Sequence, residues 1–286
     1  MTIAAGFCCG DGVLLCSDSQ ESYGDFKRHQ AKIAVRQTTY SPISAKQGPF
    51  KAMFAGAGDG TFIDILVEKM WDTIKFRDES TDDLIEVLEN RAIALHQKYW
   101  PVYPEKERPS AHLLICLYRR GEERTPRLLK MEGPLLLEVA EYECIGYGVP
   151  LAKYICDRIW ETPMSLRPSI LACLYMLEQV KSHVEYCGGH SSIAYITNDG
   201  SVRVMSKITP SVMDALSTVF RVLDESMAQL LTTAPNLDIP EDKFKERLTK
   251  FTQSMIFLRK ELPSLEILNR VLKELETGWE YGDMPF

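Results

Sequence analysis

The fold of this 286-residue chain is constrained most by the order of its short apolar runs and amphipathic helical segments. Along residues 2–206, strands, paired helices, strands, paired helices and strands follow one another. This order predicts an α+β protein in which two sheets face each other and helices cover both outer faces, a four-layer αββα sandwich. We expect strands near 2–9, 12–17, 31–36, 50–55, 111–118, 126–131, 135–139, 191–197 and 201–206, and helices near 60–76, 82–98, 149–161 and 167–184.

The last part of the chain exceeds what such a sandwich needs. We expect one domain over residues 1–206 and a C-terminal helical extension over 207–286, which either packs on the core or forms an oligomer contact. A long amphipathic pattern and a breaker-rich connection predict helices near 210–233, 241–259 and 263–278.

Charge and hydropathy exclude several classes of partner. The 33 basic and 40 acidic side chains give a net charge of −7, without a basic block. Binding of nucleic acid or of anionic membranes is therefore not expected. No apolar stretch approaches the ~20 residues that span a bilayer. The N-terminus lacks a basic region and its apolar run is broken by glycine, so we expect no signal peptide and a cytoplasmic protein.

The cysteines and histidines show no pattern of a metal or disulfide site. The eight cysteines mostly lie inside apolar runs and include no C-x-x-C pair, while the five histidines are scattered. Cysteine in such runs is typical of small buried side chains in a reducing compartment. We predict neither a disulfide framework nor a metal site.

The start of the chain places a threonine directly behind the initiator methionine. Methionine aminopeptidases need a small residue after Met1, so we expect a mature chain that starts at Thr2. Such a residue carries a hydroxyl and a free α-amine of pKa ~8, and the amine can act as the base for the hydroxyl. A turn at 10–12 joins two strand runs and returns Asp18 toward Thr2. Lys32, at the start of the next strand, can reach the same place.

This segment resembles the opening of the proteasome β-subunit family and of its bacterial peptidase relatives. That family has the N-terminal-nucleophile hydrolase fold, with threonine at the mature N-terminus, aspartate sixteen residues later and lysine on the following strand. Thr2 and Asp18 match this spacing, whereas Lys32 lies two residues short of it. The resemblance implies a shorter loop between Asp18 and Lys32.

A second motif is an apolar strand that enters a glycine-rich turn before a helix. By resemblance, Gly56 supplies a backbone N–H to the developing oxyanion, and Phe54 shapes a shallow, apolar S1 pocket with Gly58 beside it. A dinucleotide loop is the competing interpretation, because Gly56, Gly58 and Gly60 lie between strand and helix. Their G-x-G-x-G spacing and the missing second strand argue against it.

A third region resembles the family with substitutions at its supporting positions. Tyr147 and Cys187 stand where the family has serines, and Val184 stands where an aspartate is usual. In the family these residues orient the N-terminal amine and an ordered water. Glu185 and His183 are candidate substitutes, although both also fit a solvated helix end.

The resemblance, which spans about residues 2–206, implies a threonine-type peptidase without a cofactor or metal. Thr2 would be the nucleophile, with Asp18, Lys32 and Gly56 as its catalytic partners and Phe54 and Gly58 in the substrate site. The implied partners are a peptide or unfolded-protein substrate, identical subunits in a self-compartmentalising ring, and an ATP-dependent unfoldase.

Two alternatives stay open at the level of sequence. The chain can be a catalytically silent, proteasome-like scaffold subunit, which the residues at positions 147 and 184 favour. It can also be an amidase or transpeptidase that acts on a small substrate.

Overall fold

The computed structural model describes residues 2–23, 26–37, 49–122, 126–205, 208, 210–234 and 239–264. These residues fall into two compact units, the first with the described residues up to 205 and the second with those from 208 to 264. All described strands belong to the first unit. The expected division into a domain over residues 1–206 and a C-terminal helical extension over 207–286 stays a prediction.

The first sheet is built around the N-terminal hairpin. Strands β1 (Ile3–Cys9) and β2 (Gly12–Asp18) pair antiparallel, with Ala4 opposite Ser17. Nearly every residue of both strands is buried, because one face of the sheet meets helices and the other meets the second sheet. The strand order is β10-β1-β2-β11-β12, completed by β10 (Tyr142–Gly146), β11 (Ser191–Thr197) and β12 (Val202–Met205).

The second sheet is antiparallel throughout, in the order β5-β6-β7-β8-β9. Its central strands are long and almost wholly buried, as their continuous apolar runs predict. The five strands are β5 (Ile33–Gln37), β6 (Phe50–Gly58), β7 (Ala111–Arg119), β8 (Arg127–Glu132) and β9 (Leu135–Val139).

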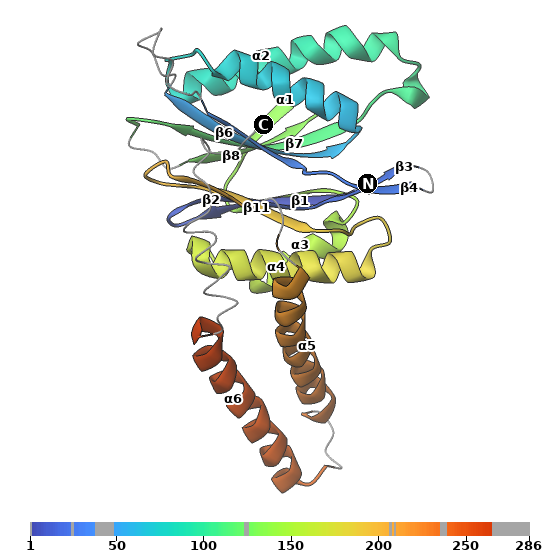
Figure 1. Ribbon diagram of the computed structural model, residues 1–286, viewed down its shortest axis with the longest axis vertical. Coiled ribbons are helices and arrows are strands. Elements are labelled where there is room, and N and C mark those ends of the chain that lie inside the picture. The colour runs from blue at the N-terminus through green and yellow to red at the C-terminus, as the bar shows by residue number, and fades with distance from the viewer. Residues whose placement is uncertain are drawn as a thin grey trace. The chain divides into compact units, whose positions relative to one another are not determined.

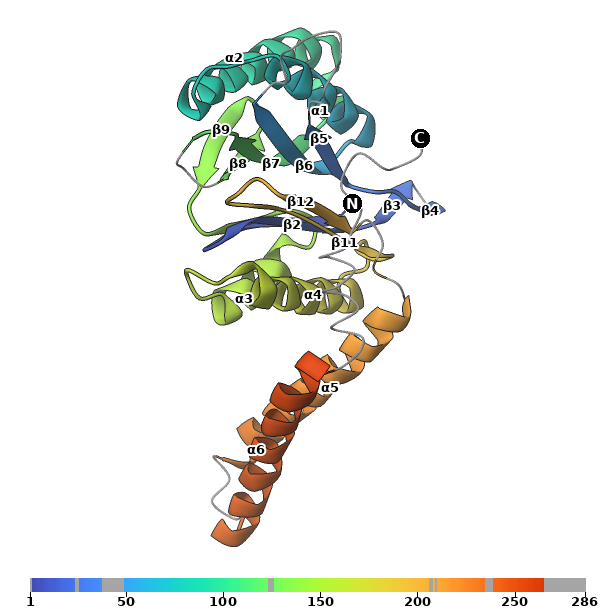
Figure 2. The same ribbon diagram turned by 60° about the vertical axis from the view of Figure 1, so that its left-hand side comes forward.

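Two helix pairs cover the outer faces of the sheets (Figures 1 and 2). Helices α1 (Gly60–Ile74) and α2 (Thr81–Tyr99) lie on the second sheet, and α3 (Val149–Ile159) and α4 (Leu166–His183) lie on the first. Two short 3-10 turns, η1 (Trp100–Val102) and η2 (Glu105–Glu107), follow α2. The four-layer αββα sandwich predicted from the element order is confirmed.

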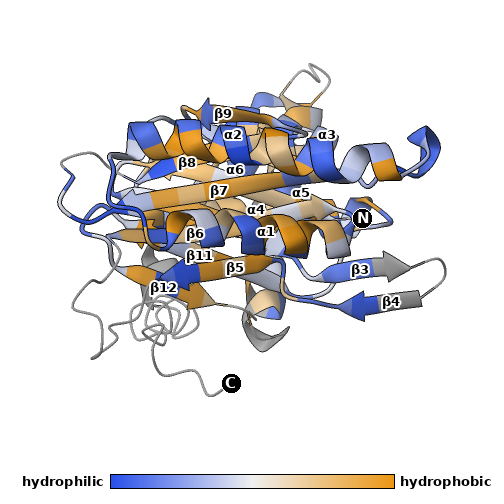
Figure 3. Ribbon diagram, turned by 90° about the horizontal axis from the view of Figure 1, so that it is seen from above, coloured by the Kyte–Doolittle hydropathy of each residue, from blue (hydrophilic) through white to orange (hydrophobic). Residues whose placement is uncertain are grey.

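Side-chain polarity explains why the layers stack in this way. Polar and apolar residues alternate along the faces of α1 and α2 (Figure 3), and the apolar side chains pack on the second sheet. Asp59 caps α1 by accepting from the Phe62 N–H at 2.8 Å, and Ser80 caps α2. A second apolar cluster, which includes Leu15, Met53 and Leu114, fills the space between the two sheets.

Three strands are present where the sequence pattern predicts none. Strands β3 (Gln20–Tyr23) and β4 (Phe26–His29) form a separate two-stranded hairpin, and β10 pairs with β1 as an edge strand of the first sheet. Their polar or mixed composition lacks the apolar alternation by which half-buried strands are found. The mostly polar segment 37–48, between the strands expected near 31–36 and 50–55, lies almost wholly outside the described residues.

The second unit contains α5 (Pro210–Thr233) and α6 (Glu241–Ser264). The bounds predicted for α5 are correct. The predicted end of the next helix near residue 259 is wrong, because α6 continues through Pro263 to Ser264. Most of the helix predicted over 263–278 lies outside the described residues. Among the described helices, none is long and apolar enough to cross a membrane.

Candidate active site

Thr2 lies immediately before β1, and the turn after β10 fixes its backbone. The N–H of Tyr147 donates to the Thr2 carbonyl at 2.7 Å, and the N–H of Gly148 approaches it at 3.4 Å. Gly146 makes this contact possible, because its φ is +102° and a Cβ there would lie 2.3 Å from the Thr2 oxygen. The turn therefore requires glycine at position 146.

Strand register brings Asp18 to the hydroxyl of Thr2. Because the β1–β2 hairpin pairs Ala4 with Ser17, Asp18 ends opposite the start of β1. Its fully buried carboxylate accepts from the Thr2 hydroxyl and from the Ile3 N–H at 3.2 Å through Oδ1. Oδ2 accepts from the Gly188 N–H at 2.9 Å. Both carboxylate oxygens are thus held by donors.

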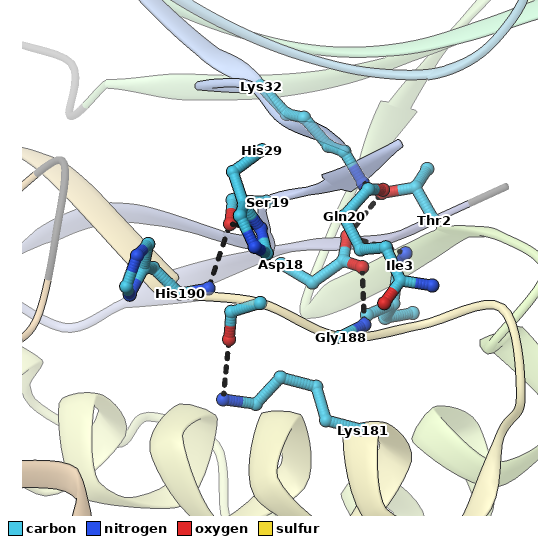
Figure 4. Close-up of polar contacts among 11 residues, drawn as sticks. Thr2, Ile3, Asp18, Ser19, Gln20, His29, Lys32, Lys181, Gly188 and His190 are labelled. Carbon is cyan, nitrogen blue, oxygen red and sulfur yellow. Dashed lines mark hydrogen bonds and ion pairs between the residues drawn. The ribbon is translucent and has the colours of Figure 1, made fainter. Parts of the chain in front are cut away.

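Lys32, just before β5, completes the constellation from the opposite sheet (Figure 4). Its Nζ donates to Thr2 Oγ1, to Asp18 Oδ1 at 2.6 Å and to the Gln20 carbonyl at 2.5 Å. An ammonium group has three protons, and these contacts provide three acceptors. Burial lowers the pKa of Lys32 below its ordinary value, while the Asp18 carboxylate opposes that shift.

A cavity of about 590 Å³ opens at this constellation. Five of the six site residues predicted from the sequence line it, namely Thr2, Lys32, Phe54, Gly56 and Gly58, whereas Asp18 lies behind them, fully buried. The shallow, apolar S1 pocket expected at Phe54 stays a prediction, and the cavity as a whole is not apolar. Its wall also carries three acids and two further bases, which are Glu21, Asp64, Glu68, Arg36 and Lys69.

The two glycines on β6 are required by the packing around them. A Cβ on Gly56 would lie 2.5 Å from Ile63 Cγ2 of α1. Gly58 has a φ of +131°, and a Cβ there would lie 2.1 Å from the Ser110 carbonyl oxygen. Neither position can carry a side chain without displacing its neighbours. The backbone of β6 therefore lies bare along the cavity.

The third motif surrounds the site, but neither a serine nor a carboxylate stands at its three substituted positions. Cys187 is buried, and burial raises its pKa to about 12, which keeps it a neutral thiol. Tyr147 is exposed and packs edge-on against Tyr186 at 5.1 Å. Val184 ends α4.

The two candidate substitutes both face solvent. His183 is exposed, and its Nδ1 lies 2.8 Å from the Gln179 carbonyl of its own helix. Glu185 is exposed as well. Both observations agree with a solvated helix end.

Several groups that build the site were not found from the sequence. They are the Gln20 carbonyl that binds Lys32, the Tyr147 N–H that holds Thr2, and the Ser19 hydroxyl, which accepts from the His190 N–H at 2.8 Å. Two of these groups are main-chain atoms, which carry no residue-type signal. In the sequence, the Gly188–Gly189 pair indicates a turn in the loop whose Gly188 N–H donates to Asp18.

In the part of the chain that the structure describes, no three His, Cys, Asp or Glu residues are arranged to hold a metal ion.

Comparison with protein-family models and with curated proteins found no match. Solved structures of Anbu are similar over most of this chain. Anbu of Yersinia bercovieri, described as an ancestral β-subunit, is 15% identical, with a TM-score of 0.67 over 83% of this chain and 100% of its own. A Gly-1 mutant of Anbu from Hyphomicrobium sp. strain MC1 is 14% identical, with a TM-score of 0.66 over 84% and 100%.

A third similar structure is the Anbu complex of Pseudomonas aeruginosa, described as a helical assembly. It is 12% identical, with a TM-score of 0.64 over 84% of this chain and 99% of its own. At these identities the likeness establishes the fold alone. The chain therefore shares the fold of proteasome-like β-subunits.

Proposed function

We propose that this protein is a threonine peptidase that uses Thr2 as an N-terminal nucleophile after removal of Met1. The observation that carries the proposal is that Thr2 Oγ1 contacts both the Asp18 carboxylate and the Lys32 ammonium at the edge of a cavity. A structural ion pair needs no hydroxyl at a cavity wall beside it. A nucleophile needs both a polarising charge and space for a substrate.

The reaction begins with proton transfer from the Thr2 hydroxyl. The α-amine of processed Thr2 takes this proton, directly or through a water molecule, and Oγ1 attacks the peptide carbonyl. The tetrahedral intermediate collapses when its C–N bond breaks, and the leaving amine receives the proton. Water then hydrolyses the resulting ester, which releases the acid and restores the hydroxyl. No redox partner is needed.

Lys32 and Asp18 have complementary parts in this scheme. The Lys32 ammonium stabilises negative charge that develops on Oγ1 and favours the neutral form of the amine. Asp18 compensates the buried charge of Lys32 through the 2.6 Å ion pair and receives the Gly188 N–H. Because the Asp18 carboxylate is fully buried between these donors, it stays oriented toward Lys32.

The oxyanion would form next to the bare backbone of β6. We assign its stabilisation to the N–H of Gly56, which shares the cavity with Thr2. One such donor contributes about 3 kcal/mol in other oxyanion holes. On the same strand, the exposed Gly58 would contact the substrate backbone, and the fully buried Phe54 would shape the substrate pocket from behind its wall.

A peptide or an unfolded protein is the substrate class that this mechanism serves. Self-assembly is supported by the P. aeruginosa neighbour, whose structure is described as a helical assembly. A closed ring of identical subunits, delivery by an ATP-dependent unfoldase and a cytoplasmic location are further parts of the proposal, which rest on the sequence resemblance.

A catalytically silent scaffold subunit is the second candidate. The observation that favours it is the chemistry at positions 147, 184 and 187, where an exposed tyrosine, a valine and a neutral buried thiol stand. Valine has no hydrogen-bonding group and a thiol is only a weak one, while the exposed Tyr147 ring packs against Tyr186.

Hydrolysis of a panel of fluorogenic peptides separates the two candidates. Wild-type protein should release the fluorophore, Thr2→Ala should lose all turnover, and Thr218→Ala, an exposed threonine on α5, should behave as wild type. Equal turnover in wild type and Thr2→Ala would exclude Thr2 as the nucleophile. No turnover in any protein of the set would favour the scaffold.

A further inference from the structure

The cavity at Thr2 continues as a groove along one edge of the second sheet. β5 is the edge strand of that sheet, and α1 lies beside it on the outer face (Figures 2 and 3). Both elements line the cavity at the spacing of a single face, every second residue on the strand and every third or fourth on the helix. These lining residues include Ala34 and Arg36 of β5 and Ile63, Asp64, Val67 and Glu68 of α1.

The groove starts beside Gly56, the residue assigned to the oxyanion. The register of β5 and β6 places Lys32 next to Gly56. Ile63 lies at the same level, because its Cγ2 would be 2.5 Å from a Cβ on Gly56. Since α1 follows β6 in the chain and returns to Gly56 at Ile63, the helix runs back along β6 and in the same direction as β5. Distances along the groove can therefore be counted from this level.

The carboxylates of α1 come before the cation at the far end of the groove. Five helical residues lead from Ile63 to Glu68, about 7.5 Å at the rise of an α-helix. Four residues lead from Lys32 to Arg36, about 13 Å along a strand. The Arg36 guanidinium is held at that end, where its Nη1 donates to the Val35 carbonyl at 3.1 Å. A side chain that enters from the nucleophile therefore meets the acids of α1 first.

Asp64 and Glu68 form a like-charged pair one turn apart on α1. Both are exposed, and neither carboxylate has an ion pair or hydrogen bond within the described part of the chain. Lys69, the next residue of the helix, approaches Asp72 at 3.8 Å instead. Carboxylates four residues apart on a helix repel each other. A cation bound between them would remove this repulsion.

A third acid, Glu21, lies at the mouth of the groove. Its Oε1 would be 2.8 Å from a Cβ on Gly60, so the carboxylate lies at the start of α1. Its Oε2 accepts from Arg28 at 2.5 Å. Because Arg28 already compensates this charge, Glu21 contributes less to the recognition of a cation than the pair on α1.

We propose that the groove selects lysine or arginine as the residue whose carbonyl Thr2 attacks. The aliphatic stem of that residue lies against Ala34, and its cation lies between Asp64 and Glu68. A lysine with its four-carbon stem extended reaches about 6 Å, which brings the charge to these acids but not to the far end of the groove. An aspartate or glutamate is shorter and would be repelled by the same acids. The inference rests on the proposed function, since it names the substrate of the same site.

Four fluorogenic peptides that differ in one residue test this preference. They are acetyl-leucyl-leucyl-X-aminomethylcoumarins, in which X is arginine, lysine, leucine or glutamate. We expect kcat/KM for the arginine and lysine peptides to exceed that for the leucine peptide about tenfold, the effect of one charge-assisted hydrogen bond. The glutamate peptide should be the poorest substrate. Added salt should reduce the advantage of the basic peptides, because the acids of α1 are exposed.

Variants of the acid pair assign the preference to the groove. Asp64→Asn combined with Glu68→Gln should lower the ratio of kcat/KM for the arginine peptide to that for the leucine peptide about tenfold. This ratio is diagnostic, because a general loss of activity lowers both values alike. Asp64→Lys should make the glutamate peptide a better substrate than the arginine peptide. Asp72→Asn, the control, removes an exposed acid of the same helix that does not line the cavity, and it should leave the ratio unchanged.

The outcomes separate this inference from the proposed peptidase. Equal kcat/KM for the arginine and leucine peptides, or a ratio that the double variant leaves unchanged, would overturn the inference and leave the peptidase standing. Absence of turnover with every peptide would overturn the peptidase, and binding would then decide the inference. For that case, fluorescein-labelled leucyl-leucyl-arginine amide and leucyl-leucyl-leucine amide are titrated into Thr2→Ala and followed by fluorescence anisotropy. Tighter binding of the arginine amide, lost when Asp64→Asn and Glu68→Gln are added, would support the preference, and equal binding would refute it.

Discussion

The two sides of Thr2 are built from different chemistry. On the hydroxyl side, Oγ1 meets a buried carboxylate and a buried ammonium, which come from Asp18 and Lys32. On the backbone side, main-chain N–H groups of Tyr147 and Gly148 hold the Thr2 carbonyl, and Cys187 packs against Gly148.

This difference shows which part of the site depends on the side chains and which on the backbone. Strand register alone brings Asp18 to Thr2, and three acceptors orient Lys32. The backbone side keeps the turn geometry but offers no serine or carboxylate at positions 147, 184 and 187, and the side chain of Tyr147 is exposed. In the proposed reaction, the hydroxyl is thus held for attack, whereas support for its base is reduced.

Removing the charge on the hydroxyl side should have the largest effect. Lys32→Met should lower peptide turnover about a thousandfold, because the developing charge on Oγ1 loses its partner. It should also destabilise the fold by about 3–5 kcal/mol, because Asp18 is left buried and unpaired. Steady-state kinetics and urea unfolding measure the two effects.

A double variant and a control substitution of a second lysine separate the effect on turnover from the effect on stability. Asp18→Asn combined with Lys32→Met should recover most of the stability but none of the turnover. Lys181→Met removes another largely buried lysine, which donates to Ser191 at 3.0 Å outside the cavity. A comparable loss of turnover in Lys181→Met would mean that Lys32 acts through stability alone.

On the backbone side, Gly146→Ala should be the most damaging change. The substitution forces alanine into a φ of +102° and pushes its Cβ to 2.3 Å from the Thr2 carbonyl oxygen. We expect a loss of about 1–3 kcal/mol in unfolding free energy and a clear loss of turnover. Gly121→Ala is the control, because its φ is +85° but nothing lies within 4 Å of the new Cβ. Retained turnover in Gly146→Ala would show that the turn does not position Thr2.

Restoring a hydroxyl on the backbone side should increase activity. Cys187→Ser replaces a thiol of pKa about 12 with a stronger hydrogen-bonding group beside the site. If the absence of serine at position 187 limits proton transfer to the α-amine of Thr2, kcat should rise about twofold to tenfold in this variant. That gain corresponds to one net hydrogen bond. Cys173→Ser, at a fully buried position under the first sheet, should only lower stability. Unchanged kcat in Cys187→Ser would place the limitation elsewhere.

The smallest expected effect is a pH dependence of stability that arises from Lys32. Its pKa is lowered in the folded state, so the unfolded chain binds more protons between that lowered value and the ordinary 10.5. The stability of wild type relative to Lys32→Met should therefore rise with pH across this window. Denaturant unfolding at pH 8 to 10.5 gives the difference. A stability difference that falls with pH would mean that the Asp18 carboxylate raises the pKa of Lys32 more than burial lowers it.

Much of the fold follows from the sequence because its strands are strongly apolar and its helices strongly amphipathic. The buried run of β7, with Leu113, Leu114 and Ile115, is an example. The β3–β4 hairpin could not be found in this way, since Gln20 and Glu21 carry no apolar alternation. The continuation of α6 through Pro263 shows that one proline near the end of a helical pattern does not fix the boundary.

The candidate site was predictable where residue identity carries the chemistry. Thr2, Asp18 and Lys32 were named from spacing, and the structure brings their side chains together. The donors and acceptors of the main chain were not predictable, because the Gln20 carbonyl and the Tyr147 N–H depend only on conformation. The polarity of the cavity wall was also missed, since its acids and bases come from elements far apart in sequence.

The most direct measurement is the intact mass of the purified protein before and after incubation with a peptide epoxyketone. This probe forms a stable ring with both the hydroxyl and the free α-amine of an N-terminal threonine. We predict a protein that lacks Met1 and gains one adduct, with no adduct on Thr2→Ala. A protein that retains Met1 and gains no adduct would contradict nucleophilic catalysis by Thr2 and support the scaffold.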